Sequence, residues 1–368
     1  MVRIGVIGGG INSAVGRAHL SALNLDANWK VVSGFFSRDK DVNYLSGQAW
    51  RTELLYDSFE SFICEDNQQI DAVLVLTPTP SHYEIVQSLL NRDLNIICEK
   101  SLTTSNQKAR LISDLAVRNS LKLFVTFNYT GYPMVREIRN RIIEGFYGKI
   151  HTISIQMPQE GFAVVDETGK SKKIQNWRRS DYEIPTVSLD LGVHINNLAH
   201  FLLGDQQKRV VSLENHFGRI ENTIDSVHYI CEFTSGVVGN FWFGKSYLGI
   251  RNGLSLSVFG DQGSAKWTQL TPDQYWESDS MGRTRHVDLG EVGLTVANKD
   301  RYMRFKAGHP TGFIEAFANL YKDIEMSLLN QTGENHSAYV FTALDAAKGL
   351  KELEAVHLSA RIGKWVDI

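Results

Sequence analysis

Two different patterns of hydrophobic and polar positions divide the chain. Up to about residue 127, short runs of consecutive apolar residues alternate with amphipathic segments. This pattern is typical of parallel strands that are buried on both faces by crossing helices. The expected strands are 1–7, 29–37, 72–76, 95–98 and 122–127, and the expected helices are 17–25, 44–50, 83–92 and 105–118. The first part of the chain is therefore predicted to be an α/β domain of the Rossmann type.

From about residue 151, polar and apolar residues alternate along each expected strand. Alternation predicts a large, mostly antiparallel open sheet with one face against helices, and the other face is expected to join subunits into a homodimer or homotetramer. We place the domain boundary so that residues 1–128 form the first domain and residues 129–368 form a C-terminal α+β domain. The expected strands are 151–157, 209–216, 226–233, 236–243, 254–259 and 264–267, with helices at 134–144, 189–201 and 311–329 and a loop at 164–176.

Composition narrows the classes of function. A chain of 368 residues is too long for one core, which agrees with two domains. Its net charge of −3 leaves no basic surplus for nucleic acid or an anionic membrane, and no apolar run approaches 18 residues. The three cysteines have no paired spacing, so neither a disulfide framework nor a zinc cluster is indicated and a cytoplasmic location is expected.

A glycine-rich turn follows the first expected strand and opens the first expected helix. Glycines permit a tight turn there, and backbone N–H groups at a helix N-terminus can hold a pyrophosphate. The spacing is imperfect because Ser13 stands at the place of the third glycine. A glycine turn without a ligand is the alternative interpretation. The residues expected to hold NAD or NADP here are Gly8, Gly10, Asn12, Ser13 and Ala14.

Further polar residues lie at the carboxyl ends of the other expected strands, where ligands of such sheets bind. Ser37 and Arg38 favour the 2′-phosphate of NADP, but Asp39 could still accept the ribose hydroxyls of NAD, so the cofactor is left as NAD or NADP. The remaining residues expected to bind the cofactor are Thr77, Pro78, His82, Glu99, Lys100 and Asn128.

The order of several motifs resembles one known family. The glycine turn is followed by Cys98-Glu99-Lys100, Trp177-Arg178, and Asp190 to His194 at the start of a helix, with segments 128–133 and 308–317 between and after them. Together they are similar to the glucose-fructose oxidoreductase/inositol dehydrogenase/MocA family. The resemblance implies an NAD(P)-dependent dehydrogenase acting on a sugar, sugar derivative or cyclitol. Two departures are Ser101, where the family usually has proline, and Asn12, where this branch often has glycine.

Oxidation of a carbinol requires a proton acceptor and a group that stabilises the developing alkoxide. Lys100 and His194 fit these roles, and Asp190 lies four residues before His194, on the same face of a helix, where it can orient the imidazole or bind a substrate hydroxyl. A surface lysine and a core histidine are the structural alternatives.

The residues expected to bind substrate are amphipathic or polar side chains that suit a polyhydroxylated ring. Each has a simpler interpretation as a core aromatic, an ion pair or a turn cap. Arg178, Arg179 and Lys172-Lys173 could add recognition of a phosphate or a nucleotide-linked sugar, although a charged loop is more often only solvated. The expected substrate residues are Tyr129, Trp177, Arg178, Asp190, Asn197 and His309.

A metal centre is disfavoured because His194 and His200 are six residues apart and so do not share a helix face. His19 and His82 are expected to cap or line the cofactor site instead. Two other functions stay open. One is NAD-dependent glycoside hydrolysis through transient oxidation of the sugar, which some members of the family perform, and the other is a non-catalytic NAD(P)-binding redox sensor.

Overall fold

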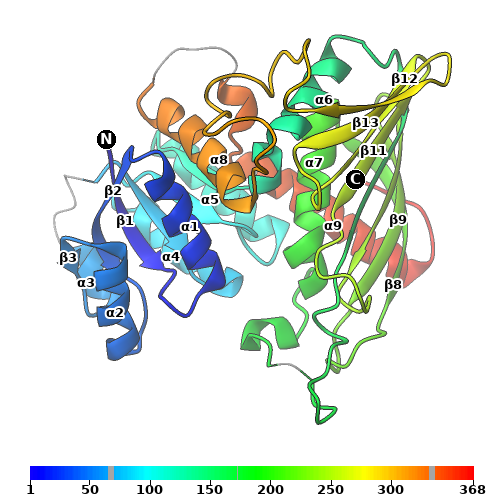
Figure 1. Cartoon of the computed structure of the whole chain (residues 1–368). Helices are drawn as coiled ribbons and strands as arrows, with labels where there is room; N and C mark the ends of the chain where they lie inside the picture. Colours follow the sequence, from blue (N-terminus) through cyan, green and yellow to red (C-terminus); the bar gives the residue numbers. More distant parts are fainter. Residues whose placement is uncertain (65–69, 172, 331–335) are drawn as a thin grey trace. The chain divides into compact units, whose positions relative to one another are not determined.

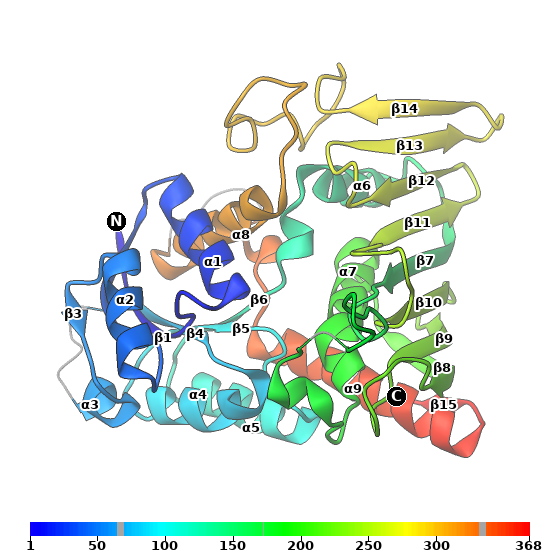
Figure 2. The ribbon, with the colours of Figure 1, turned by 60° about the horizontal axis from the view of Figure 1, so that its bottom comes forward.

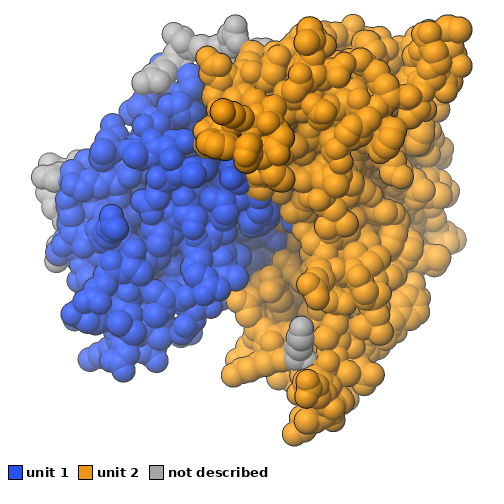
Figure 3. Space-filling view, in the orientation of Figure 1, with its two compact units in different colours: residues 1–131, 313–347 blue, residues 132–312, 348–368 orange. Residues whose placement is uncertain are grey.

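The computed structural model describes residues 1–64, 70–171, 173–330 and 336–368. The chain divides into two compact units, unit 1 with residues 1–131 and 313–347 and unit 2 with residues 132–312 and 348–368 (Figure 3). Each unit contains its own β-sheet (Figures 1 and 2). In these described parts of the chain, no helix has an apolar stretch that could cross a membrane.

Unit 1 is built on a six-stranded parallel sheet with the order β3-β2-β1-β4-β5-β6. Its central strands are almost entirely buried, as a sheet covered on both faces requires. The predicted Rossmann-type fold is confirmed. The elements are β1 (Val2–Gly8), α1 (Ala14–Leu25), β2 (Trp29–Phe35), α2 (Lys40–Trp50), β3 (Leu54–Leu55), α3 (Phe59–Cys64), β4 (Ala72–Leu76), α4 (His82–Leu90), β5 (Ile96–Glu99), α5 (Asn106–Arg118) and β6 (Leu123–Thr126).

A late segment of the chain returns to unit 1. Helix α8 (Phe313–Leu328) packs beside α1, and its Phe317 and Tyr321 join the hydrophobic core under the sheet (Figure 1). The segment after α8 lies beside β6, where the amide of Val125 donates to the carbonyl of Phe341 over 2.8 Å. The predicted division assigned this whole segment to the second domain; the compact units differ because hydrophobic burial against α1 attaches it to the first.

Unit 2 is built on a nine-stranded sheet with the order β14-β13-β12-β11-β7-β10-β9-β8-β15. Only the β7–β10 pair is parallel among these described pairs, so the predicted mostly antiparallel sheet is confirmed. The strands are β7 (Ile150–Pro158), β8 (Gln207–Asn215), β9 (Ser226–Phe233), β10 (Val238–Gly244), β11 (Ser255–Gly260), β12 (Gly263–Thr268), β13 (Gln274–Asp279), β14 (Thr284–Asp288) and β15 (Val366–Asp367).

Helices α6 (Pro133–Ile143) and α7 (Val193–Leu203) cover one face of this sheet (Figure 2). Helix α9 (Ala343–Ile362) is attached to β8, where the amide of Ser212 donates to the hydroxyl of Ser359 over 3.1 Å. Along β9 and β10, buried residues alternate with residues that face away from the helices. The strands β13 and β14 and the long helix α9 were not predicted from the pattern.

Candidate active site

The glycine turn after β1 has the geometry of a phosphate-binding cradle. Gly8 and Gly9 have φ values of 81° and 70°, which disfavour residues with a Cβ. A Cβ on Gly16 would lie 2.2 Å from the carbonyl oxygen of Gly9, so the helix approaches the turn as closely as glycine allows. Ser13 caps α1 by accepting the amide of Gly16 over 3.0 Å. Asn12 and Ala14 are exposed at this helix N-terminus, where backbone N–H groups favour an anion.

The end of β2 carries the residues expected to meet the adenosine ribose. The Asp39 carboxylate caps α2, accepting the amides of Asp41 and Val42 over 3.0 and 3.1 Å. Ser37 accepts the amide of Asp39 over 3.1 Å. Arg38 between them is exposed. Both capping bonds go to Oδ1 of this exposed carboxylate, so the cap occupies one of its two oxygens.

His82, expected at the cofactor site, lies between two backbone carbonyl groups. Its imidazole is fully buried, with Nε2 2.6 Å from the carbonyl oxygen of Thr77 and Nδ1 2.8 Å from that of Ser101. Burial lowers the pKa of His82, although the two carbonyl groups partly oppose it. The ring thus connects the end of β4 to the residue after Lys100. Thr77 is half-buried and Pro78 exposed at this strand end.

Glu99 is a buried acidic group of unit 1 that is held by hydrogen bonds from two side chains. Its carboxylate accepts hydrogen bonds from Thr126 and from His19, whose Nε2 lies 3.3 Å away, and His19 Nδ1 lies 2.5 Å from the hydroxyl of Tyr321. Burial alone would raise the pKa of Glu99, but the hydrogen bond from His19 and the neighbouring charge of Lys100 bring it below its ordinary value. His19 therefore holds the carboxylate of Glu99 in place.

Lys100 follows this anchored glutamate at the carboxyl end of β5 and is half-buried; its peptide bond to Ser101 is cis. Asn128, just after β6, is buried, and its Nδ2 group has no hydrogen-bond partner among the described residues. A buried donor of this kind is available to a ligand. Tyr129 instead packs against Phe313, with ring centroids 6.1 Å apart, within unit 1.

In unit 2, a π-helical turn (Ser188–Gly192) leads directly into α7. Such turns widen a helix locally and are common at functional sites. Asp190, His194 and Asn197 follow one another along this segment and are all buried. Gly192 permits close packing, because a Cβ there would lie 2.8 Å from the ring of Phe243. The predicted helix thus exists, but its first turn is π-helical.

The carboxylate of Asp190 is held by two cations. Oδ1 lies 3.0 Å from a terminal nitrogen of Arg178, and Oδ2 forms an ion pair with Lys245. The guanidinium of Arg178 also lies over the ring of Trp177, 4.8 Å from its centroid. The sequence predicts that Asp190 contacts the imidazole of His194 or a substrate hydroxyl. It does not predict the contact with Lys245. Lys245 follows β10 directly, and that position at a strand end is the only sequence signal for it.

The remaining residues expected to bind substrate lie in loops. His309 is exposed, with Nδ1 3.3 Å from the carbonyl oxygen of Lys306 and its ring 4.5 Å from that of Phe305. Arg179 and Lys173 are exposed, and Lys172 lies outside the described residues. The structure therefore associates Trp177 and Arg178 with Asp190, whereas the contacts of His309 are within its own loop.

Two family models match this chain, one over the part that forms the parallel sheet and one over most of the rest. A model described as "Oxidoreductase family, NAD-binding Rossmann fold" matches residues 2–127, and one described as "Oxidoreductase family, C-terminal alpha/beta domain" matches residues 139–368. The uncharacterized oxidoreductase YfiI of Bacillus subtilis is 26% identical to this chain over 392 residues, covering 100% of this chain and 96% of its own length.

Two solved structures have the same fold. An oxidoreductase from Sinorhizobium meliloti is 25% identical with a TM-score of 0.85, and 99% of each chain is covered. An inositol dehydrogenase homolog from Azotobacter vinelandii, complexed with NADH and myo-inositol, is 24% identical with a TM-score of 0.87, covering 100% of this chain and 97% of that one. The fold of unit 1 and unit 2 is therefore shared with oxidoreductases over nearly the whole chain.

Proposed function

Because the chain belongs to the glucose-fructose oxidoreductase/inositol dehydrogenase/MocA family of NAD(P)-dependent oxidoreductases, we propose that it oxidises a carbinol carbon of a sugar, sugar derivative or cyclitol. The observation that carries the proposal is Lys100, a half-buried lysine at the carboxyl end of β5 whose neighbour Glu99 is held by hydrogen bonds from His19 and Thr126. The inositol dehydrogenase homolog bound to NADH and myo-inositol supports this substrate class.

The residues of unit 1 fit a dinucleotide. The turn at Gly8 and the N-terminus of α1 would hold the pyrophosphate, and the unpartnered Nδ2 of Asn128 would donate to the cofactor. Arg38 would meet the 2′-phosphate of NADP, whereas Asp39, whose cap uses only Oδ1, would accept the ribose hydroxyls of NAD, so the cofactor is NAD or NADP. When bound, the nicotinamide supplies the hydride acceptor.

The chain's own residues would then manage the proton of the substrate hydroxyl. Lys100 would donate a hydrogen bond to the hydroxyl oxygen and stabilise the negative charge that develops on it. His194 would accept the proton, since imidazole is the side chain best suited to proton transfer near neutral pH. Asp190, carried on the same segment as His194, would accept a hydrogen bond from a second substrate hydroxyl and so orient the ring.

The open face of the sheet in unit 2 supports the proposed association into a homodimer or homotetramer. Several large apolar side chains are exposed on its strands. Burial of such residues drives subunit association. They are Leu213, Ile230, Val238, Phe259 and Trp276.

The test is to incubate the protein with NAD+ or NADP+ and a panel of sugars, cyclitols and glycosides while recording the absorbance of the reduced nicotinamide. Net reduction supports a dehydrogenase. Cleavage of a glycoside without net reduction would indicate hydrolysis through transient oxidation. Tight cofactor binding with neither reaction would indicate a redox sensor, and both of these results contradict the proposal.

A further inference from the structure

Two cationic side chains, Arg178 and Lys245, meet at the carboxylate of Asp190. One carboxylate, with a side chain 7% exposed, faces the ammonium of Lys245, which is 9% exposed, and the guanidinium of Arg178, which is 27% exposed. Water therefore screens Lys245 poorly and reaches Arg178 only in part. Both cations attract an anion that comes within reach of them.

Arg178 still has a hydrogen-bond donor to use. One terminal nitrogen binds Asp190, but the buried Nε group has no hydrogen-bond partner among the described residues. Stacking on Trp177 fixes the plane of the guanidinium and hence the direction of that donor. A buried N–H without an acceptor is unfavourable, and an acceptor supplied by a ligand would satisfy it.

Arg285 in the same unit shows how a purely structural arginine is satisfied. Its Nε and one terminal nitrogen donate to the same oxygen of Glu277 over 3.0 and 2.8 Å, and its other terminal nitrogen donates to Glu291 over 3.1 Å. All three nitrogens of that guanidinium have acidic partners. Arg178 has one acidic partner for one nitrogen and is otherwise held by an aromatic ring.

We propose that Arg178, assisted by Lys245, binds an anionic oxygen group of the substrate, so that the sugar oxidised is an acid or a phosphate ester rather than a neutral sugar. This inference rests on the proposed dehydrogenase function and narrows its substrate. The guanidinium presents its free edge to the anionic oxygens, as arginine does with carboxylates and phosphates. Lys245 supplies a second positive charge, and Asp190 keeps the two cations from repelling each other in the absence of substrate.

The test is calorimetric titration of the protein, saturated with its oxidised cofactor, with matched probes. Glucose, glucuronate and glucose 6-phosphate share one ring, as do galactose, galacturonate and galactose 6-phosphate. We expect at least one anionic probe to bind about tenfold or more tightly than its neutral partner, the scale of one charge-assisted interaction. Preference for the uronates identifies a carboxylate, and preference for the phosphate esters identifies a phosphate.

Arg178→Gln should remove most of that preference, whereas Arg179→Gln, which changes the adjacent exposed arginine, should retain it. Arg178→Lys should restore part of it, because the charge returns without the planar donor pair. Thermal unfolding of each variant checks the fold. The proposal is overturned if no anionic probe binds more tightly than its neutral partner, or if Arg178→Gln keeps the preference.

Binding and turnover separate the two proposals. Anionic probes that bind through Arg178 without any reduction of NAD(P)+ across the panel would contradict the dehydrogenase function and leave the anion site intact. Turnover of neutral sugars alone would support the dehydrogenase and overturn the anion site.

Discussion

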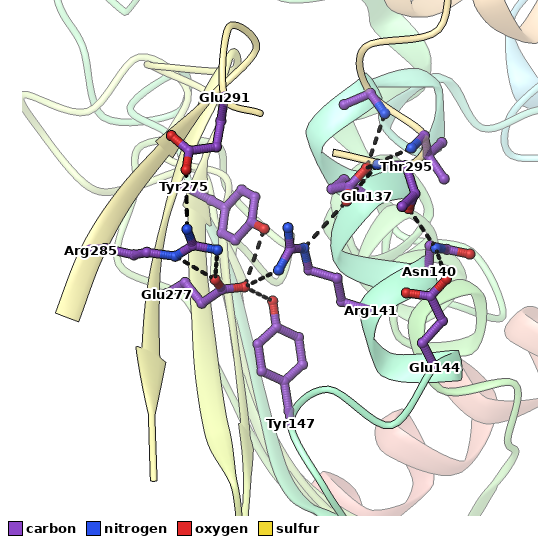
Figure 4. Close-up of polar contacts among 12 residues, drawn as sticks. Glu137, Asn140, Arg141, Glu144, Tyr147, Tyr275, Glu277, Arg285, Glu291 and Thr295 are labelled. Carbon is purple, nitrogen blue, oxygen red and sulfur yellow. Dashed lines mark hydrogen bonds and ion pairs between the residues drawn. The ribbon is translucent and has the colours of Figure 1, made fainter. Parts of the chain in front are cut away.

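Unit 2 contains two clusters of acidic and basic side chains, one around Glu277 and one around Asp190. They differ in whether their hydrogen-bond donors have acceptors within the protein. At the first, Glu277 is 2% exposed, and its two oxygens accept from Arg141, Arg285, Tyr147 and Tyr275 (Figure 4). At the second, Asp190 forms ion pairs with Lys245 and with a partly exposed Arg178, whose Nε group has no hydrogen-bond partner among the described residues. A charged cluster whose donors and acceptors are matched holds the fold, and one with a surplus donor is prepared for a ligand.

The first cluster also fixes the surrounding segments. Helix α6 contributes Arg141 and, one turn earlier, Glu137, whose carboxylate accepts the amides of Val296 and Ala297 over 2.8 and 3.0 Å (Figure 4). Burial, together with the negative charge of Glu277, raises the pKa of Tyr147 well above its ordinary value, so this phenol remains a donor. The matched cluster thus joins α6, β13 and the segment after β14.

The largest expected effect is on stability and comes from a substitution in the cluster around Glu277. Glu277→Gln should lower the free energy of unfolding by about 3–5 kcal/mol, because it removes the buried carboxylate that faces the buried guanidinium of Arg141. Urea denaturation measures this. Glu291→Gln removes an acid that is 36% exposed from the same Arg285 and should cost less than about 1 kcal/mol. Equal losses in the two variants would mean that Glu277 is not the centre of the cluster.

The second largest effect is expected from substitution of Lys100, and it is on turnover rather than on stability. Lys100→Met should reduce kcat by about 10²-fold or more, the scale of a lost electrostatic or proton-transfer group, with little change in cofactor affinity. Steady-state kinetics and fluorescence titration with the reduced cofactor separate the two quantities. A folded variant with nearly normal turnover would remove Lys100 from the proposed mechanism.

Unit 1 also has an arginine with a possible anionic ligand. Arg38 is exposed and follows the end of β2 beside Asp39, which caps helix α2. Arg38→Ala should weaken NADP binding by roughly tenfold and NAD binding much less, since a charge-assisted contact to the 2′-phosphate is lost. Dissociation constants for both cofactors measure this. Equal weakening of both would indicate stacking on adenine instead.

The smallest expected effect is on acid stability. The pKa of Glu99 is lowered in the folded protein, so its ionised form stabilises the fold above the ordinary glutamate pKa of 4.5, and this contribution is lost as the pH falls through the lower folded value. Glu99→Gln should therefore unfold with a weaker pH dependence below about pH 4.5 than the parent protein. Thermal melts between pH 3 and pH 7 test it, and parallel profiles would refute it.

Much of unit 1 could be predicted from the sequence because buried parallel strands are continuous apolar runs. Strand β4 (Ala72–Leu76) has the predicted bounds. Strand β13 was missed because it buries Glu277, and a buried carboxylate breaks the alternation by which an antiparallel strand is identified. Helix α9 was missed because its buried residues are largely small alanines spread around the helix rather than one apolar stripe.

The candidate site, too, could be predicted only where its residues stand in local sequence motifs. Lys100, Asp190 and His194 stand in motifs, so their positions at a strand end and a helix start could be predicted. Lys245 could not, because it is 55 residues from Asp190 and the two meet only when β10 lies beside the π-helical turn. The bracing roles of His19 and His82 also depend on contacts between distant segments, and local pattern gives no sign of them.

The most direct test of the distinction between the two clusters is kcat/KM for the best substrate in the parent protein, Asp190→Asn and Tyr147→Phe, measured well below their melting temperatures. Asp190→Asn should lower kcat/KM by about 10²-fold or more. Tyr147→Phe, which removes one hydrogen bond to Glu277, should leave it within about threefold. A normal value for Asp190→Asn, or an equal loss in Tyr147→Phe, would contradict the assignment of substrate chemistry to the incomplete cluster.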